Sequence, residues 1–589
     1  MSKVTGNAVD FPVLSRVFEF VKPYKKTFGI TLFLTITLAF LSPVRPWLIQ
    51  YTFDRHIASG DMQGLLAMTL LMVALLFAEA ILNFYYIYLA NWLGQVVIRD
   101  LRVKLYSHIN QFRLKYFDHT PIGTLVTRVI SDMETIADIF SEGLLVIIGD
   151  VLKLIVVIGV MFWVDYRLAL ISLSTIPLLL FSTWLFKNAI KSSFQEVRNE
   201  VAKLNAFLQE HITGMNVVQI FNREDEEMGR FKKINARHRD ANIDSVWYYS
   251  IFLPVVEVLS AVSIGLLVWW GAKGVIRDQV TLGNLVAFIL YIHMLFRPIR
   301  ELADRFNTLQ MGMVSSERVF KVMDTISVID NKGTQKMDTL KGEIKFENVW
   351  FAYNDEDWVL KGISFTVKPG ETMALVGATG SGKSSIISLL SRFYEYNKGK
   401  ISIDGIDIRD YELNELRKNI AVVLQDVFLF SDTIANNISM KNEAVTKEQI
   451  REASIAVGAD DFISSLPGNY DYNVMERGAM LSVGQRQLIS FIRAYIYNPK
   501  ILVLDEATSS IDTESEFLIQ SAMNKLTENR TSVVIAHRLA TVQKADKIIV
   551  LDKGEILEMG THQQLLKNNG HYKTLFELQF KNSKEGSLA

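Results

Sequence analysis

Six long apolar segments in the first half of the chain restrict its fold more than any other feature. They cover residues 27–50, 64–94, 139–164, 168–186, 246–271 and 282–295. Most reach the roughly 20 residues that a helix needs to cross the hydrocarbon core of a bilayer. The last segment is short because Arg297 follows it. We assign it as a span because it pairs with the fifth segment. Any one segment could be a buried helix of a soluble protein, but six, with Trp and Tyr near several ends, predict a helical membrane domain.

The distribution of basic side chains predicts the orientation of these spans. Lys and Arg are dense before the first span, between the second and third, and between the fourth and fifth. The other connections, at 54–63, 165–167 and 273–280, are short and carry little positive excess. By the positive-inside rule we expect a multi-pass protein of the inner, cytoplasmic membrane with both termini in the cytoplasm. No cleavable signal peptide is apparent, because the first apolar run starts late and is too long.

The segments on the expected cytoplasmic side have a helical periodicity of their own. Residues 11–26 suit either a helix in the membrane interface or a soluble cap helix. Between the fourth and fifth spans, apolar side chains recur at spacings of four and three: Ile190, Phe194, Val197, Val201, Leu204 and Leu208. This narrow seam predicts that the membrane helices continue into the cytosol as a bundle. Turns or short crossing helices are expected at the breaks, near 119–123 and 214–221.

The second half of the chain has a different pattern of apolar and polar residues. Short β-branched segments alternate with helical ones, at 344–351, 372–376, 420–424, 501–504, 532–536 and 547–551. Such alternation predicts a largely parallel sheet covered by helices, and hence an α/β domain. We therefore divide the chain into an interfacial elbow helix (1–26), an all-α six-helix transmembrane domain (27–322), a linker (323–341), the α/β domain (342–580) and a polar tail (581–589).

Composition excludes several other classes of function. The chain has no cysteine, so it has no disulfide framework, no thiol catalysis and no thiolate metal site. Its formal net charge is −1, which gives no reason to expect a nucleic acid as a partner.

A phosphate-binding loop lies in the α/β domain. Gly377, Gly382, Lys383 and Ser384 satisfy the pattern G-x-x-x-x-G-K-[ST], between an apolar strand and a helix that is expected to start at about Lys383. Glycines let backbone N–H groups turn inward around an anion, and the helix N-terminus faces the same anion. Lys383 should reach the β- and γ-phosphates of a nucleoside triphosphate, and the Ser384 hydroxyl should hold Mg²⁺. The predicted nucleotide contacts are Gly377, Ala378, Thr379, Gly380, Ser381, Gly382, Lys383, Ser384 and Ser385.

Polar side chains elsewhere in this domain complete a candidate hydrolytic site. A buried strand ends in Asp505, which can support Mg²⁺ through water, and Glu506, which can polarise the attacking water. Gln425 follows another strand, where its amide could touch both the metal and the water. His537 could bond the γ-phosphate, and Tyr353 could stack on the base. Taken alone, Gln425, His537 and Tyr353 could each equally be a structural residue without a role in the site.

The stretch Leu481-Ser-Val-Gly-Gln485 lies just before an apolar helix and allows these separate motifs to be interpreted together. It resembles the Leu-Ser-Gly-Gly-Gln signature of the ATP-binding cassette (ABC) family, and the layout is similar to that of a half-transporter of the exporter type. The resemblance covers nearly the whole chain. In the membrane part it rests on Phe117-Asp118, residues 123–128 with Asp132, and residues 281–285 with Phe288 and Tyr291.

The resemblance implies ATP and Mg²⁺ as cofactors and gives the candidate residues their roles. The implied catalytic residues are Glu506, His537 and Gln425, and the implied metal-binding residues are Ser384, Gln425 and Asp505. Tyr353 is implied to stack on adenine. The turns near 119–123 and 214–221 are implied to be the coupling helices that sit on the cassettes.

The resemblance also implies a partner subunit, because one chain supplies only half of the spans and one cassette. In this family two cassettes stack head to tail, so the ATP on one chain meets the other chain's Ser482, Gly484, Gln485 and Asp512. Both a homodimer and a heterodimer stay open. Val483 replaces the first signature glycine, as in subunits of heterodimers, yet the chain has every residue that two identical sites need.

The implied function is ATP-driven export or flipping of hydrophobic or amphipathic compounds, such as drugs, lipids or peptides, by alternating access. The alternative is an ATP-gated channel or regulatory protein without uphill transport. Membrane lipid is the other expected partner, and the cargo itself is not named by the sequence. Glu79 and Glu257 are candidate cavity residues, because a carboxylate at membrane depth should face the bundle interior or a partner. Asp150 and Lys153, three residues apart, could equally neutralise each other or contact cargo.

Overall fold

The computed structural model of the protein describes residues 11–336, 340–354, 356–505, 513–536 and 539–577. They fall into two compact units. The helical unit comprises the described residues up to Gln111 together with Thr120–Ile326. The second unit comprises Phe112–His119 and the described residues from Ser327 onward. A short segment that lies between two spans in the sequence therefore belongs to the second unit.

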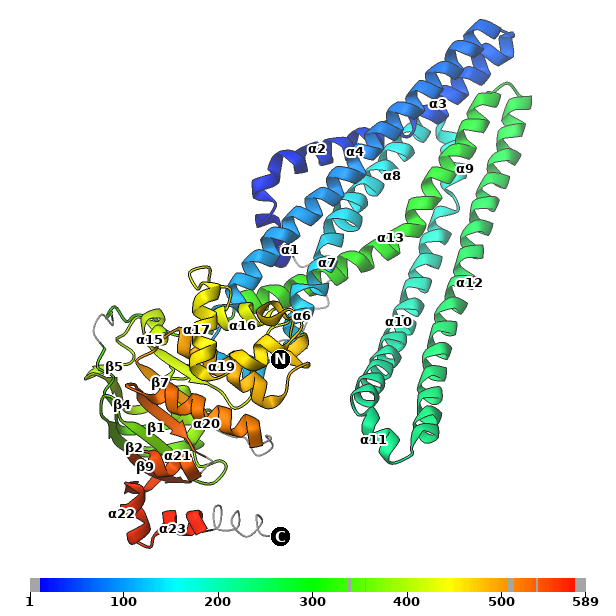
Figure 1. Cartoon of the computed structure of the whole chain (residues 1–589). Coiled ribbons are helices and arrows are strands. Elements are labelled where there is room, and N and C mark those ends of the chain that lie inside the picture. The colour runs from blue at the N-terminus through cyan, green and yellow to red at the C-terminus, as the bar shows by residue number, and fades with distance from the viewer. Residues whose placement is uncertain (1–10, 337–339, 355, 506–512, 537–538, 578–589) are drawn as a thin grey trace. The chain divides into compact units, whose positions relative to one another are not determined.

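The helical unit has the architecture that the apolar segments predict. Its helices are α1 (Phe11–Glu19), α2 (Lys25–Leu41), α3 (Val44–Tyr51), α4 (Met62–Ile109), α6 (Ile122–Val129), α7 (Ser131–Asp138), α8 (Leu144–Val164), α9 (Tyr166–Leu173), α10 (Ile176–Thr213), α11 (Met215–Ile220), α12 (Glu224–Ile276) and α13 (Leu282–Met323), drawn in Figure 1. Among the described residues, six helical stretches are long and apolar enough to cross a membrane, which confirms the six predicted spans. The sixth, Leu282–Ile299, is only the start of α13.

Four of the described helices, α4, α10, α12 and α13, are far longer than a membrane is thick. α10 has 38 residues and α12 has 53, whereas about 20 suffice to span a bilayer. They run side by side, and α11 lies at their joined ends (Figure 1). Phe186 stacks on Phe252 with 4.1 Å between ring centroids, and the hydroxyl oxygens of Ser193 and Ser245 lie 2.7 Å apart. The apolar seam in the sequence thus marks a real continuation of the membrane helices.

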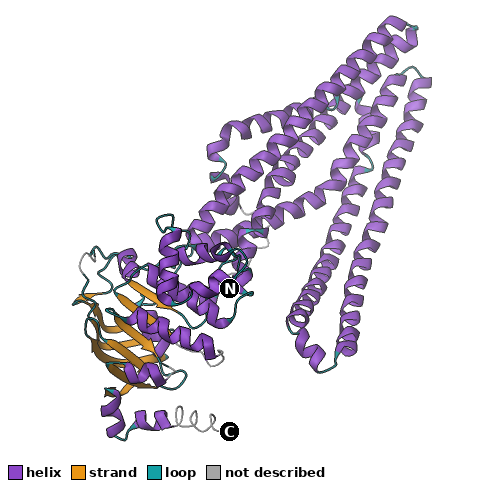
Figure 2. Ribbon diagram, in the orientation of Figure 1, coloured by secondary structure: helices purple, strands orange, loops and turns teal. Residues whose placement is uncertain are grey.

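The second unit is built on two sheets (Figure 2). The larger sheet has the order β10-β9-β3-β8-β7-β6, and every pair of neighbours is parallel except β10 with β9. Its strands are β3 (Thr372–Val376), β6 (Ile420–Val423), β7 (Ile501–Asp505), β8 (Thr531–Ile535), β9 (Lys547–Asp552) and β10 (Glu555–Gly560). The predicted parallel sheet is therefore confirmed for five of its six predicted strands.

The remaining predicted strand belongs to a different sheet. β1 (Ile344–Ala352) is part of an antiparallel sheet of order β2-β1-β4-β5, with β2 (Trp358–Val367), β4 (Lys398–Ile403) and β5 (Ile406–Asp407). The sequence analysis missed β2, β4, β5 and β10. The first three residues of β4 are exposed, and β10 alternates exposed with half-buried residues, so neither strand forms an apolar run.

Both faces of the larger sheet are buried, which explains the apolar character of its strands. On one face, Leu375 and Val533 share a core with Phe346 of the smaller sheet. On the other face, Leu502 and Val534 pack with residues of α17 (Lys447–Val457), α19 (Val483–Ile496) and α20 (Thr513–Thr527). This layering fixes the positions of the strand ends, where the candidate site residues lie.

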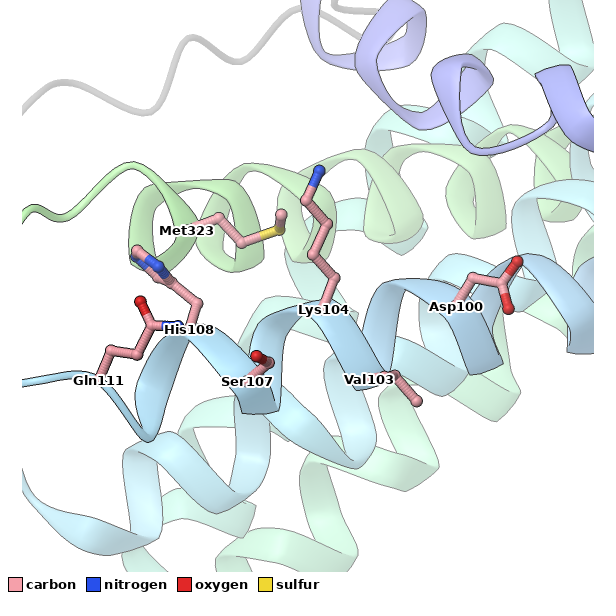
Figure 3. A pocket seen from close by; sticks show the side chains of 7 residues that line it. All are labelled: Asp100, Val103, Lys104, Ser107, His108, Gln111 and Met323. Carbon is pink, nitrogen blue, oxygen red and sulfur yellow. The ribbon is translucent and has the colours of Figure 1, made fainter.

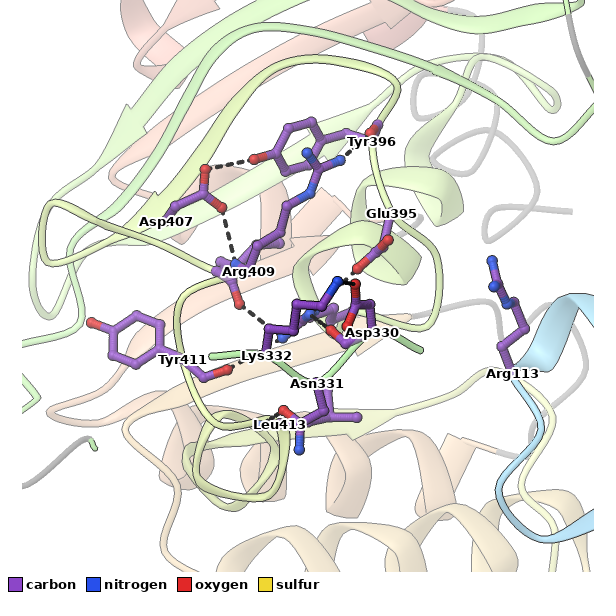
Figure 4. A network of polar contacts seen from close by, with 12 residues as sticks. Arg113, Asp330, Asn331, Lys332, Glu395, Tyr396, Asp407, Arg409, Tyr411 and Leu413 are labelled. Carbon is purple, nitrogen blue, oxygen red and sulfur yellow. Dashed lines mark hydrogen bonds and ion pairs between the residues drawn. The ribbon is translucent and has the colours of Figure 1, made fainter. Parts of the chain in front are cut away.

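Part of the predicted linker is fastened to the second unit (Figure 4). Asn331 Oδ1 accepts a hydrogen bond from the backbone N–H of Leu413 at 2.9 Å. Arg392 is only 1% exposed, and one of its terminal guanidinium nitrogens donates to the carbonyl oxygen of Asp330 at 2.6 Å. Its other terminal nitrogen donates to two carbonyl oxygens of the segment 408–411, each at 3.3 Å. The guanidinium therefore ties the linker to the edge of the smaller sheet.

Arg392→Met is expected to destabilise the second unit by about 3 kcal/mol, because three carbonyl groups lose a charged donor in a buried place. The measurement is the thermal unfolding of the full-length protein in detergent. Lys332→Met is the matched control, because this neighbouring side chain is 87% exposed and, in the described part of the chain, forms its ion pair with Asp330. Equal melting temperatures for the two variants would contradict the role assigned to Arg392.

Candidate active site

The phosphate loop lies between β3 and α14 (Lys383–Leu390), and α14 begins at the residue that the motif indicates. Gly380 and Gly382 have φ angles of +81° and +104°, a conformation that other residues rarely adopt. At Gly377, an added Cβ atom would lie 2.2 Å from the carbonyl oxygen of Leu551. The loop can therefore close tightly only with these glycines, and its N–H groups can bind an anion at the start of α14.

Lys383 lies inside the loop. Its residue is 7% exposed, and its Nζ donates to the carbonyl oxygens of Gly377 and Ala378 at 2.8 and 2.9 Å. Burial lowers the pKa of this ammonium group, and the charge of Asp505 opposes part of that effect. Phosphate oxygens at this place would supply the full negative charge that carbonyl groups do not. The side chain is thus positioned for a polyanionic ligand.

The candidate metal and water ligands follow the carboxyl ends of parallel strands, which meet at one edge of the sheet. Asp505 ends β7 and is half-buried, close enough to Lys383 to interact with its charge. Gln425, two residues after β6, is exposed, and so is Ser384 on the first turn of α14. Three predicted site residues lie outside the described part of the chain: Glu506, Asp512 and His537.

Tyr353 lies beside the first turn of α14. Its hydroxyl oxygen is 3.0 Å from Ser385 Oγ. Its ring meets Phe351 and Tyr394 edge-on, with 4.7 and 4.9 Å between ring centroids. These contacts hold the ring next to the phosphate loop, as stacking on a base requires.

Two residues of α5 (Leu114–His119) also contact this aromatic group, and the sequence analysis gave them no such role. Lys115 Nζ donates to the carbonyl oxygen of Tyr353 at 2.8 Å, and the Tyr394 hydroxyl donates to the carboxylate of Asp118. Burial, together with the Asp118 carboxylate, raises the pKa of that hydroxyl. Lys115 and Tyr353 are 238 positions apart, and no local pattern connects them.

The signature stretch forms the start of helix α19. The Ser482 hydroxyl accepts the backbone N–H of Gln485 at 3.2 Å, and Gln485 Oε1 accepts the backbone N–H of Ser482 at 3.0 Å. This reciprocal capping box fixes the helix N-terminus. Gly484 is buried, whereas Val483 is 50% exposed. The substituted position therefore projects from the helix end instead of packing in the core.

The two candidate cargo carboxylates lie in different surroundings. Glu79, on α4, lines a polar cavity of about 670 Å³ in the helical unit. Glu257, on α12, is exposed and is not among the residues that line this cavity. Asp150 approaches Arg305 of α13, with 3.2 Å between Oδ2 and Nε, so a cation from another helix lies close to it in addition to Lys153.

A second hollow of about 600 Å³ lies between α4 and the end of α13 (Figure 3). Lys104, His108 and Met323 line it, and the His108 ring bonds the carbonyl oxygen of Thr325 at 3.0 Å. The hollow therefore lies where the ends of two long helices are fastened together, and we assign it no ligand.

Two family models together match most of the chain. The ABC transporter transmembrane region matches residues 28–299, and the ABC transporter model matches residues 360–509. The first covers the six apolar stretches almost entirely, and the second runs from β2 through the phosphate loop to the stretch after β7.

Several curated proteins are similar over nearly their whole length. An ABC transporter ATP-binding protein of Bacillus subtilis is 39% identical, with 96% of this chain and 94% of the relative covered. Another B. subtilis protein, which bears a multidrug export ATP-binding/permease name, is 38% identical, with 96% and 99% covered. An ATP-dependent lipid A-core flippase of Desulfotalea psychrophila is 35% identical, with 96% and 99% covered.

Proposed function

This chain belongs to the ABC transporter family, and we propose that it moves hydrophobic or amphipathic compounds across the cytoplasmic membrane by alternating access. It hydrolyses ATP and couples hydrolysis to export. The observation that carries the proposal is the joining, in one chain, of six membrane-crossing helical stretches to a unit with a complete phosphate loop. Positive charge on the long connections supports an orientation with both termini in the cytoplasm.

The phosphate loop and its neighbours hold MgATP in this proposal. Loop N–H groups and Lys383 bind the phosphates, and Tyr353 stacks on adenine. Ser384, Gln425 and Asp505 offer a hydroxyl, an amide and a carboxylate, which are oxygen ligands of the kind that Mg²⁺ accepts. The ion neutralises charge that develops on the phosphates during transfer to water.

Two further side chains perform the hydrolytic step. Glu506 polarises the attacking water, and His537 bonds the γ-phosphate. Glu506 is the first residue after β7, and His537 is the second residue after β8. These two strands are neighbours in the parallel sheet, and β8 also pairs with β3, which leads into the phosphate loop. This order of strands supports their assignment, because a γ-phosphate on the loop would lie within reach of both strand ends.

A second subunit completes each ATP site. The capped N-terminus of α19, with Ser482, Gly484 and Gln485, faces the ATP held by the partner, and Asp512 approaches the same interface. A helix N-terminus attracts anions, so ATP draws the two cassettes together and hydrolysis weakens that attraction. The contacts of Lys115 and Asp118 with the Tyr353 and Tyr394 group support a direct mechanical connection between α5 and the nucleotide.

Uphill transport is the experiment that tests this function. Purified protein is reconstituted into vesicles, and a fluorescent amphipathic compound is added to the solution outside them. ATP is added to the same side, where it reaches the cassettes that face outward. We expect accumulation against a gradient that stops when ATP is exhausted. Hydrolysis without accumulation of any hydrophobic or amphipathic compound would favour a regulatory protein or a gated channel over a pump.

The partner subunit can be identified with the chain expressed alone. Because it has a complete loop, Glu506 and a capped α19, we expect a homodimer whose hydrolysis depends on Glu506. Size-exclusion chromatography with light scattering gives the oligomeric state, and phosphate release gives the activity. A chain that stays monomeric or inactive until a second cassette subunit is added would establish the heterodimer instead, with Val483 as its altered signature.

A further inference from the structure

A charged contact joins α10 and α12 where both helices meet α11 (Figure 1). His211 lies in the last turn of α10 and Glu227 in the first turn of α12, with 2.9 Å between Nε2 and Oε2. Both residues lie well beyond the predicted fourth and fifth spans, 168–186 and 246–271. The contact therefore closes the connection that contains α11, outside the membrane-crossing part of the two helices.

Both ring nitrogens of His211 face hydrogen-bond acceptors. Nδ1 lies 2.8 Å from the carbonyl oxygen of Phe207, and Nε2 faces the Glu227 carboxylate. A neutral imidazole has one N–H donor and can satisfy only one of these acceptors, whereas an imidazolium satisfies both. The Phe207 ring stacks on the imidazole, with 3.8 Å between ring centroids, and fixes its plane. The geometry therefore selects the charged form of His211.

The charges around this contact come from the elements on both sides of it. The charged side chains that face the imidazole or its partner are Glu210 on α10, Arg223 just before α12, and Glu227 and Arg230 on α12. Arg230 contacts the second carboxylate oxygen of Glu227 at 2.9 Å, and Arg223 pairs with Glu226. α11 itself carries no charged side chain. The ring therefore meets two carboxylates, and both nearby arginines have a carboxylate partner of their own.

These surroundings determine how the contact depends on pH. The hydrogen bond to Glu227, and then the one to the carbonyl oxygen of Phe207, raise the pKa of His211 above its ordinary value, although burial opposes them. A group whose pKa is raised in the folded protein stabilises the fold at low pH and loses that effect as the pH rises through the raised value. The contact between α10 and α12 is therefore complete at low pH and weakens at alkaline pH.

Little else holds α11 in place. His211 and Glu227 line a hollow of about 390 Å³ together with Val217, Val218 and Phe221, which belong to α11 and the turn after it. Every side chain of α11 is exposed or half-buried. Because short helices in proteins depend on packing for their stability, a helix of six residues with so little of it depends on its flanking contacts.

We propose that His211 is a positioning residue whose protonation fastens α11 to the ends of α10 and α12 and thereby makes transport dependent on pH. With the imidazolium in place, α11 moves together with the helix pair. When the proton leaves to solvent, the neutral ring keeps one acceptor, and α11 moves more freely. The inference rests on the proposed export function, in which the long helices carry movement between the cassettes and the spans, and it adds a regulation to that path.

A spin label on α11 measures this fastening without any need for transport. The chain has no cysteine, so Gln219→Cys, at an exposed position of α11, gives a single labelling site in the full-length protein in detergent. We expect the ratio of mobile to immobile label to rise about threefold between about pH 6 and pH 9, the change expected for loss of one partly exposed ion pair. The midpoint should lie above the ordinary histidine pKa of 6.5.

Three substitutions identify the titrating group in the labelled protein. His211→Gln cannot titrate and should give a ratio that does not change with pH. His211→Lys keeps a positive charge up to about pH 10 and should hold the label immobile at pH 9. Glu227→Gln removes the charge that favours the imidazolium and should move the midpoint to lower pH. His238→Gln, on α12 where the ring contacts Asn242, is the matched control and should leave the midpoint unchanged.

The outcomes separate this inference from the proposed function. A mobility that does not depend on pH, or a transition that persists in His211→Gln, would overturn the role of His211. In vesicles, the amount of compound transported per ATP hydrolysed should fall about threefold from about pH 6 to pH 9, and this fall should disappear in His211→Lys. A constant ratio despite the label transition would overturn the regulation. If the label responds but no compound is transported at any pH, the fastening stands and the export function is wrong.

Discussion

Lys383→Ala is expected to weaken ATP binding about 100-fold and to abolish hydrolysis at ordinary ATP concentrations. The ammonium group is almost fully buried and donates to two neutral carbonyl oxygens, those of Gly377 and Ala378. Phosphate oxygens would replace those neutral partners with charged ones, and a charged hydrogen bond contributes about 3 kcal/mol at the upper end. Removing the side chain removes that contribution and leaves the loop backbone in place.

Binding of a fluorescent ATP analogue to the purified full-length protein measures this effect. Lys368→Ala is the matched control, because Lys368 is exposed in the turn before β3 and lies outside the loop. The assignment of Lys383 to the phosphates would be lost if its alanine variant bound the analogue within a factor of two of the unmodified protein.

Glu506→Gln is expected to lower the rate of ATP hydrolysis without weakening ATP binding. The rate of hydrolysis should fall about 1,000-fold, within the range for loss of a general base, while ATP affinity stays near that of the unmodified protein. The physical reason is that glutamine keeps the size of the side chain but cannot polarise the attacking water with a charge. ATP should then accumulate at the closed interface between two subunits.

Single-turnover phosphate release and an equilibrium binding measurement test the two parts of this expectation. Glu555→Gln, on the exposed strand β10, is a control of the same chemistry in the same unit. Near-normal turnover in the Glu506→Gln protein would assign the general base to another residue. Lost ATP binding would instead give Glu506 a structural role.

Elements defined by a short stretch of residues could be predicted from the sequence. The six spans follow from the length of apolar runs, and the start of α14 at Lys383 follows from glycine spacing. Five strands of the parallel sheet were predicted because both faces of the sheet are buried, so each of these strands contains an apolar run. β4 and β10 were missed because exposed residues interrupt their apolar character.

Contacts between distant segments could not be predicted in this way. The linker is fastened by Arg392, whose partners are backbone carbonyl groups that carry no sequence signature. Lys115 reaches the carbonyl oxygen of Tyr353 from a helix that lies between two spans. Each contact depends on the path of the folded chain, because a backbone carbonyl group is the same at every residue.

The charged residues of α8 show which information the sequence contains and which only the tertiary structure supplies. Asp150 and Lys153 are three residues apart on one helix, and helical geometry alone makes them candidates to neutralise each other. The sequence determined that both charges lie within an apolar span. Only the packing of α13 against α8 decided that Asp150 meets Arg305, with 3.2 Å between their atoms. The physical reason is that a carboxylate in a confined space pairs with the cation that a neighbouring helix brings closest, and the spacing of residues along one helix does not show which cation that is.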